Sequence, residues 1–326
     1  MFNSSVGAAA ASAHVRVITW NVYDLPEALF PIESAKRMNQ AATSLAKHCR
    51  PMASVDAVVL TELCVEKDRQ RVLSGLTEMG LRHHAELVAG SLRDRLRLSG
   101  IVVASRWPIE SQDSVLFRNG CHGIDSLANK GAVYVRLKKQ LEGRVEPINL
   151  FGTHFYVGRS GHDAEDRKLQ AHELAAFMRQ KVPAGDEIVL LAGDLNAPWP
   201  LEGPDILKTL GAYPLEPSGE LRYTFVGGAG HLLSGSPKQS IASRIKRHMG
   251  DPKGLSDLQA GRKWVDYVAA LKLGKRPREA TMRAVEAKGS SYAFGGSSAE
   301  ACQSNELSDH HPVVGDFLFD GPPGHL

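Results

Sequence analysis

The chain lacks three features that would at once narrow its class: a strong net charge, a long apolar run and clustered cysteines. Its 326 residues carry a formal net charge of only +3, so no overall field demands a polyanionic partner. No run of 18 apolar residues occurs, which excludes a transmembrane helix. The four cysteines are widely spaced without a Cys-x-x-Cys pair, which argues against a zinc knuckle. With 43% hydrophobic residues, the chain can still bury a large core.

The first 13 residues are small and polar, with a short alanine run at their centre. As written they lack the basic and apolar regions of a signal peptide. We expect a disordered segment over 1–13, then a single domain over 14–320 with inserted loops near 226–262 and 270–304. The expected location is cytoplasmic for the chain as it stands, and secreted or periplasmic if a leader has been removed.

The most informative stretch is 187–199, where large apolar residues predict a buried strand whose apolar run ends at Gly193 and which Pro198 and Pro200 then stop. Asp194 and Asn196 follow with one residue between them, and the two-residue period of a strand places both side chains on one side. Carboxylate oxygen suits a hard divalent cation, and an amide N–H suits a phosphate oxygen. The alternative is a turn in which both side chains bond their own backbone.

Three more predicted strands end in a polar side chain where the apolar pattern stops. These side chains are Asn21, Glu62 and His154. A buried Glu costs several kcal/mol unless it is paired or ligating, which favours Glu62 as a metal ligand. Asn21 at such an end can offer a neutral oxygen to a cation, although an Asn considered alone is more commonly just the residue that ends a strand. Helical spacing of apolar residues predicts helices over 34–50, 66–79 and 163–181, with Lys and Arg opposite the apolar face of the first.

A polar loop over 125–130 leads into another strand at Gly131. Lys130 beside this glycine can approach a phosphate closely, and Asp125, five residues earlier, could pair with it. An ordinary surface ion pair remains the alternative.

The last third of the chain supplies three more candidates. Asp266 sits at the centre of a short predicted strand, and Asp309 and His310 come just before the final one. An adjacent Asp can bind metal or orient an imidazole, and the imidazole can take a proton from water near neutral pH. Basic residues gather over 238–248 and 272–283, which favours nucleic acid as an alternative partner.

The order of these motifs is more specific than any one of them. Trp-Asn ending at Asn21, Leu-Thr-Glu at Glu62, Gly-Thr-His at His154, Gly-Asp-Leu-Asn over 193–196, Asp-Tyr-Val from Asp266 and Ser-Asp-His at 308–310 together resemble the endonuclease/exonuclease/phosphatase (DNase I-like) superfamily. The resemblance covers nearly the whole chain. It implies an α/β fold: a four-layer αββα sandwich of two central, mostly antiparallel sheets flanked by helices, with the site at one end.

Within this superfamily, Asn-Val-Tyr over 21–23 and the spacing of Asp125 and Lys130 look like the neutral sphingomyelinase branch. The Trp-Cys-Asp-Arg signature of phosphoinositide phosphatases is absent. The resemblance implies a metal-dependent phosphodiesterase that hydrolyses sphingomyelin to ceramide and phosphocholine. A Mg²⁺-dependent nuclease of the same fold, or a phosphatase on a small ester, is the alternative. The implied partner is a phospholipid or other phosphodiester, with transient contact to a membrane surface.

The resemblance also implies a role for each residue. Glu62 would hold Mg²⁺, or alternatively Mn²⁺, with Asn21 and Asp309 close by. His310 would deprotonate the attacking water, with Asp194 orienting that water. Asn196 and His154 would donate hydrogen bonds to phosphoryl oxygens. Asp266 would orient His154 and keep it protonated, since an adjacent carboxylate raises an imidazole pKa. Lys130 would pair with the phosphate or, as a switch, with Asp125. The sequence leaves open which histidine is the base.

Overall fold

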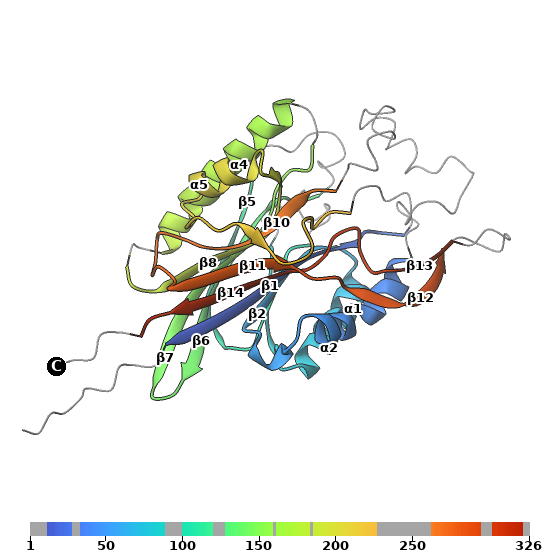
Figure 1. The fold of residues 1–326 in the computed structure, drawn as a ribbon, viewed down its shortest axis with the longest axis horizontal. Helices are drawn as coiled ribbons and strands as arrows, with labels where there is room; N and C mark the ends of the chain where they lie inside the picture. The colour runs from blue at the N-terminus through green and yellow to red at the C-terminus, as the bar shows by residue number, and fades with distance from the viewer. Residues whose placement is uncertain are drawn as a thin grey trace, which may run out of the picture.

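The structure is a computed structural model that describes residues 12–27, 33–88, 100–119, 128–158, 161–182, 185–226, 262–294 and 302–321. Two β-sheets pack face to face between two layers of helix (Figure 1). Helices α1 and α2 cover one sheet, and α4 and α5 cover the other (Figure 1). This arrangement confirms the predicted α/β class and the four-layer order.

The first sheet has seven strands in the order β3-β4-β2-β1-β14-β11-β9, and the second has five in the order β10-β8-β7-β6-β5. The first contains β1 (Ala13–Asp24), β2 (Ala57–Leu63), β3 (His83–Glu86), β4 (Val102–Ser105), β9 (Pro217–Ser218), β11 (Glu279–Ala284) and β14 (Val313–Phe319). The second contains β5 (Ile109–Leu116), β6 (Gly131–Leu141), β7 (Arg144–His154), β8 (Ile188–Trp199) and β10 (Trp264–Ala270). Most neighbouring strands are antiparallel, and β1–β2, β9–β11 and β7–β8 are parallel pairs.

The remaining described elements lie outside the two sheets. Strands β12 (Lys288–Phe294) and β13 (Cys302–Glu306) form a separate antiparallel pair beside α1 (Figure 1). The helices are α1 (Ser34–His48), α2 (Glu66–Glu78), α4 (Gly161–Lys181) and α5 (Gly203–Thr209), with a short 3₁₀ turn, η1 (Met52–Ser54). Within the described parts of the chain, none of these helices combines the length and apolarity needed to cross a bilayer.

Strand β1 shows why the inner strands are apolar on both faces. Val15 and Val17 belong to the core between the two sheets, whereas Ile18 and Trp20 belong to the core under α1 and α2. Successive side chains of a strand point to opposite faces, so a strand covered on both sides needs apolar residues throughout. Each such side chain contributes about 1.5–3 kcal/mol when fully buried.

The structure corrects two predictions. Residues 279–284, within the predicted loop 270–304, form β11, which pairs with β14 inside the first sheet. Arg37, predicted on the polar face of the first helix, is completely buried. Residues 1–11, and residues 227–261 of the predicted loop 226–262, lie outside the described residues, and Ala13 already belongs to β1.

Candidate functional site

The site begins as a line of three side chains across the second sheet. Asp194 on β8 is paired with His154 on β7 at one side and with Asp266 on β10 at the other. All three are buried, with exposures of 1%, 4% and 0%. Because paired residues on neighbouring strands lie about 5 Å apart, strand register alone brings these groups together.

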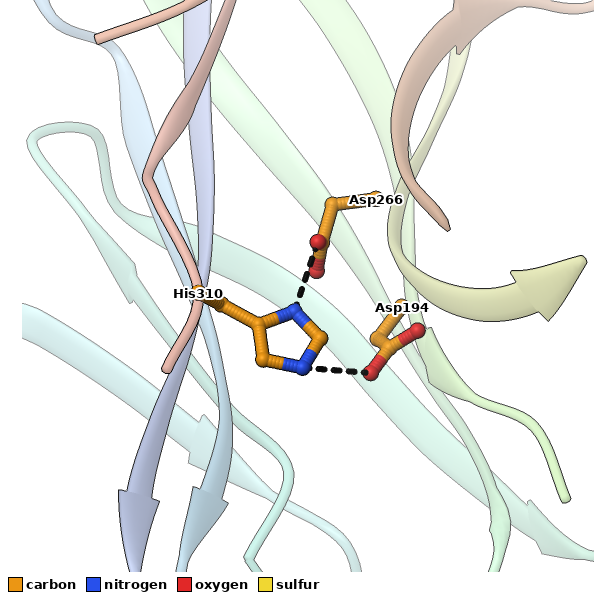
Figure 2. Close-up of side chains that lie close together, drawn as sticks. All are labelled: Asp194, Asp266 and His310. Carbon is orange, nitrogen blue, oxygen red and sulfur yellow. Dashed lines mark hydrogen bonds and ion pairs between the residues drawn. The ribbon is translucent and has the colours of Figure 1, made fainter. Parts of the chain in front are cut away.

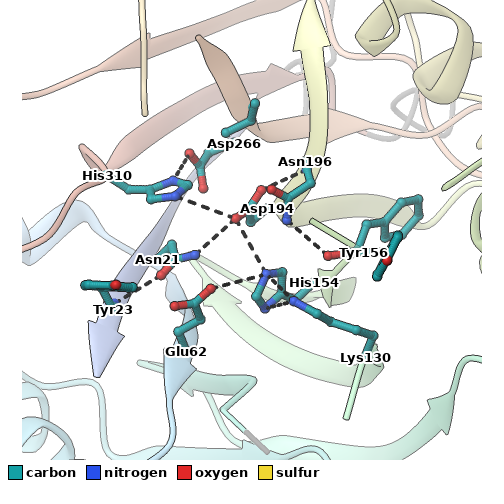
Figure 3. Close-up of polar contacts among 12 residues, drawn as sticks. Asn21, Tyr23, Glu62, Lys130, His154, Tyr156, Asp194, Asn196, Asp266 and His310 are labelled. Atoms are coloured by element: carbon teal, nitrogen blue, oxygen red, sulfur yellow. Dashed lines mark hydrogen bonds and ion pairs between the residues drawn. The ribbon is translucent and has the colours of Figure 1, made fainter. Parts of the chain in front are cut away.

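The first sheet contributes Asn21 from β1 and Glu62 from β2, at the ends of two parallel strands. Asn21 Nδ2 donates a hydrogen bond to Asp194 Oδ2 at 3.0 Å, which connects the two sheets (Figure 3). Asn21 Oδ1 accepts a hydrogen bond from the Tyr23 amide at 3.0 Å. The amide is therefore fixed from both ends.

Three residues in the last few positions of β1, β2 and β8 have left-handed backbone conformations. Tyr23, Glu62 and Asn196 have φ values of 50°, 54° and 48°. Such a conformation costs of order 1–3 kcal/mol at a non-glycine residue and persists only where the surroundings impose it. Two of these three strained residues, Glu62 and Asn196, belong to the predicted site itself.

His310 comes from the loop before β14 and crosses to the second sheet (Figure 2). Its Nδ1 is 2.8 Å from Asp266 Oδ2, and its Nε2 is 3.9 Å from Asp194 Oδ2. Burial alone would lower the pKa of His310, but Asp266, Asp194 and Asp309 raise it to about 10. His310, not His154, is therefore the partner of Asp266.

His154 has the opposite surroundings. Lys130 Nζ lies 2.9 Å from His154 Nε2 (Figure 3). Burial, together with the charges of Lys130 and His310, places the pKa of His154 well below its usual value. The prediction that Asp266 orients His154 and keeps it protonated is wrong, because β10 and β7 lie on opposite sides of β8.

The carboxylates around the two histidines have raised pKa values. Burial raises the pKa of Glu62, with Lys130 opposing the rise, and burial together with Asp266 raises the pKa of Asp194 to about 7. Glu62 Oε1 is 3.7 Å from His154 Nε2, whereas Glu62 Oε2 is buried and accepts no hydrogen bond from the described residues. A buried oxygen without a donor is costly unless a cation binds it.

The donors present suit a hard cation. Glu62, Asn21 and Asp309 offer oxygen, which Mg²⁺ prefers. The carboxyl of Asp309 acts electrostatically on Glu62, and Ser308 Oγ donates to the Asn21 carbonyl at 2.6 Å, which ties their segments together. Asp194, Asp266 and His310 also bring one ligand atom each within 4.8 Å of one another.

The structure thus brings together all but one of the residues predicted from the sequence. Asn196 completes the set. Its backbone N–H donates to Asp194 Oδ1 at 2.8 Å, and its side-chain Nδ2 donates to the Phe155 carbonyl at 3.0 Å. Lys130 is buried against His154, so it is not a surface residue. Asp125, its predicted switch partner, lies outside the described residues.

Sequence reasoning missed the segment that supports Asp266 and His310. Thr224 is completely buried, and its Oγ1 accepts hydrogen bonds from the Val265 and Asp266 amides at 3.0 and 3.2 Å. Its carbonyl accepts from the His311 amide at 2.7 Å. The Phe225 ring lies 5.0 Å from the His310 ring, centroid to centroid. This stretch shows no strong hydrophobic periodicity in the sequence. Its supporting role is therefore visible only in the hydrogen bonds that Thr224 makes.

Comparison with known proteins identifies the family of this chain. The model of the endonuclease/exonuclease/phosphatase family matches residues 18–276. Sphingomyelinase C of Listeria ivanovii is 25% identical over 315 residues, which cover 92% of this chain and 85% of the relative. The crystal structure of sphingomyelinase C from Streptomyces griseocarneus is 25% identical, with a TM-score of 0.70 over 93% of this chain and 99% of that one.

A third comparison bears on the fold alone. The beta toxin of Staphylococcus aureus, solved as a double mutant with bound magnesium ions, is 23% identical, with a TM-score of 0.72 over 95% of this chain and 100% of that one. The family match spans most of the chain, and the catalytic-type residues lie together in one buried site. The chain therefore belongs to the endonuclease/exonuclease/phosphatase family and is a phosphoric diester hydrolase of its neutral sphingomyelinase-like branch.

Proposed function

We propose that this protein is a Mg²⁺-dependent sphingomyelinase, which hydrolyses sphingomyelin to ceramide and phosphocholine. The observation that carries the proposal is the pair of buried histidines on either side of Asp194, one held by a carboxylate and one by a lysine. Beside them lies Glu62 Oε2, which has no donor among the described residues. The similarity to a sphingomyelinase C over 92% of the chain supports the choice of substrate.

His310 is the proposed base. Asp266 holds its Nδ1, so the Nε2 atom faces Asp194 and the interior of the site (Figure 2). In its neutral form Nε2 takes a proton from the attacking water, and Asp194 Oδ2 accepts a hydrogen bond that orients this water. The imidazolium that forms is stabilised by Asp266, as in other histidine–carboxylate pairs.

Lys130 and Asn196 are the proposed donors to the phosphoryl oxygens. Lys130 is the nearest cation to His154, and its ammonium group carries three N–H donors, so it can contact a phosphate while it stays beside Nε2. Asn196 uses one N–H on the Phe155 carbonyl and has a second to offer. Donors fixed in a buried site strengthen as negative charge develops on the oxygens.

Glu62, Asn21 and Asp309 are the proposed ligands of Mg²⁺. A bound Mg²⁺ would supply positive charge that polarises a phosphoryl oxygen and offsets the carboxylates that raise the pKa of His310. Mn²⁺ is the alternative ion, since it takes the same oxygen ligands.

The basic turn before β11 does not support a nuclease. Lys275 pairs with Glu146 at 2.7 Å, and its amide donates to the Glu187 carbonyl at 2.9 Å. Glu187 precedes β8, whereas Asp194 lies in its second half, so this turn is at the opposite end of the sheet from the site.

A substrate panel tests the proposal. Sphingomyelin in mixed micelles, lysophosphatidylcholine, plasmid DNA and an inositol phosphate are each incubated with Mg²⁺ and with excess chelator. We expect release of phosphocholine from sphingomyelin, fully abolished by the chelator. Turnover of DNA or the inositol phosphate with none of sphingomyelin would overturn the assignment, and full activity in chelator would overturn the metal dependence.

A further inference from the structure

Arg37 of α1 is a charged side chain buried at the edge of the site, with 0% exposure. Taking a guanidinium out of water costs several kcal/mol unless its donors are satisfied. Nearby apolar positions of α1, such as Met38 and Leu45, bury ordinary hydrophobic side chains. Core packing alone therefore does not explain a buried cation at position 37.

The guanidinium bonds two segments that are distant in sequence. Nη1 donates to the Val22 carbonyl at 2.9 Å and to the Leu307 carbonyl at 2.6 Å. Nη2 donates to the Tyr23 carbonyl at 2.5 Å and to Ser34 Oγ at 3.2 Å. One side chain thus spans the end of β1 and the loop that follows β13.

Both segments carry proposed metal ligands. Val22 and Tyr23 directly follow Asn21, and Leu307 is two residues before Asp309. The backbone here is strained, because Tyr23 has a φ of 50° and the β1–β2 register shifts between Asn21 and Asp24. A fork of donors on successive carbonyls, Val22 and Tyr23, fixes this distorted backbone in one conformation.

The Arg37 guanidinium also lies 5.9 Å from the centre of the Tyr23 ring, a favourable cation–π distance. It therefore contacts both the backbone and the side chain of this strained residue.

We infer that Arg37 is a positioning residue that holds Asn21 and Asp309 at the separation a divalent cation requires. Arg37 reaches these ligands only through the backbone of their neighbours, so it acts on metal affinity and not on the chemical step. The inference rests on the proposed metal-dependent function.

The test compares Arg37→Lys with Arg106→Lys. Arg106 likewise donates to three backbone carbonyls, those of Val55, Met52 and Met79, but away from the site. Lysine keeps the charge and loses the fork of donors, so both variants should lower the melting temperature. Calorimetric titration with Mg²⁺ alone should show affinity about 10- to 100-fold weaker in Arg37→Lys, as for other residues that support metal ligands. Arg106→Lys should bind Mg²⁺ as the wild type does.

Turnover gives a second readout. Arg37→Lys should need about 10- to 100-fold more Mg²⁺ for half-maximal rate, with near-native kcat once Mg²⁺ saturates. If Arg37→Lys does not fold, Ser34→Ala removes one acceptor of the guanidinium and should weaken Mg²⁺ binding in the same direction. Unchanged Mg²⁺ affinity in the folded variants, with a wild type that binds Mg²⁺, overturns the inference alone. A wild type that neither binds Mg²⁺ nor turns over overturns the proposed function with it.

Discussion

His310 and His154 lie in one buried site, on either side of Asp194, yet their surroundings differ in sign. His310 contacts two carboxylates, and its pKa rises to about 10 despite burial. His154 contacts an ammonium group, and its pKa falls well below the usual value. Burial penalises the charged form of both imidazoles, so the difference comes from neighbouring charge alone.

The two histidines are therefore suited to two different roles. A histidine held by a carboxylate can cycle between base and imidazolium, because the charged form is stabilised. In the proposed mechanism, a histidine beside a lysine stays neutral and serves as an acceptor that holds the ammonium group in place. Two identical side chains in one site would then take different roles, set by the sign of the neighbouring charges.

The largest expected effect is the loss of His310. His310→Ala should lower kcat by about 10²- to 10⁴-fold, because it removes the group that exchanges the proton. His84→Ala provides the control, since His84 Nε2 contacts only the Leu81 carbonyl and Thr77 among described residues, away from the site. Steady-state kinetics and thermal melting measure both variants. A near-native kcat in a folded His310→Ala protein would show that another group is the base.

Asp266→Asn should have the next largest effect. The amide keeps the size of the carboxylate but lacks its charge, so the pKa of His310 should fall from about 10 toward its usual range. We expect kcat to fall roughly 10²-fold, within the range of acid–base effects. Histidine NMR titration should show a shifted His310 and a nearly unchanged His154. Equal shifts of both histidines would contradict the separation between them.

Lys130→Met should act on the other histidine. Without the ammonium group the pKa of His154 should rise, and kcat should fall about tenfold through loss of a phosphate donor. Lys139→Met is a matched control, because Lys139 is also buried but pairs with Asp56 at 2.6 Å, remote from the site. It should lower stability and leave His154 unmoved in the NMR titration. A His154 pKa that does not respond to Lys130→Met would remove the basis of the comparison.

The smallest expected effect concerns Asp24, whose pKa is shifted mainly by burial and not by a neighbouring charge. Burial raises the pKa of Asp24 from its usual 3.8 to about 7. The native state then holds a proton that the unfolded chain releases, so this group makes the free energy of unfolding fall as pH rises from about 4 to about 7. Asp24→Asn should flatten that fall by a few kcal/mol at most, since one pKa unit is about 1.4 kcal/mol. Urea unfolding at about pH 5 and about pH 8 measures it, and identical pH profiles for variant and wild type would contradict the shift.

Most of the site could be predicted from the sequence, because polar residues interrupt apolar strands at Asn21, Glu62, His154 and Asp194. Strand ends meet at a common edge of a sheet, so polar residues at the ends of separate strands are expected to lie close together. The partner of Asp266 could not be predicted, since that depends on which strand β10 joins. Arg37 was misplaced for a related reason: helical periodicity predicts a buried apolar face, but a polar residue is also buried where it satisfies backbone carbonyls.

The hairpin of β6 and β7 has a practical use. Its register runs from Gly131 opposite His154, at the site, to Leu141 opposite Arg144, about 33 Å away along the strands. The connecting residues Glu142 and Gly143 are exposed, and a Cβ on Gly143 would meet nothing within 4 Å. A surface tether or reporter domain inserted between them would leave the site pointing away from its support, which suits an immobilised enzyme.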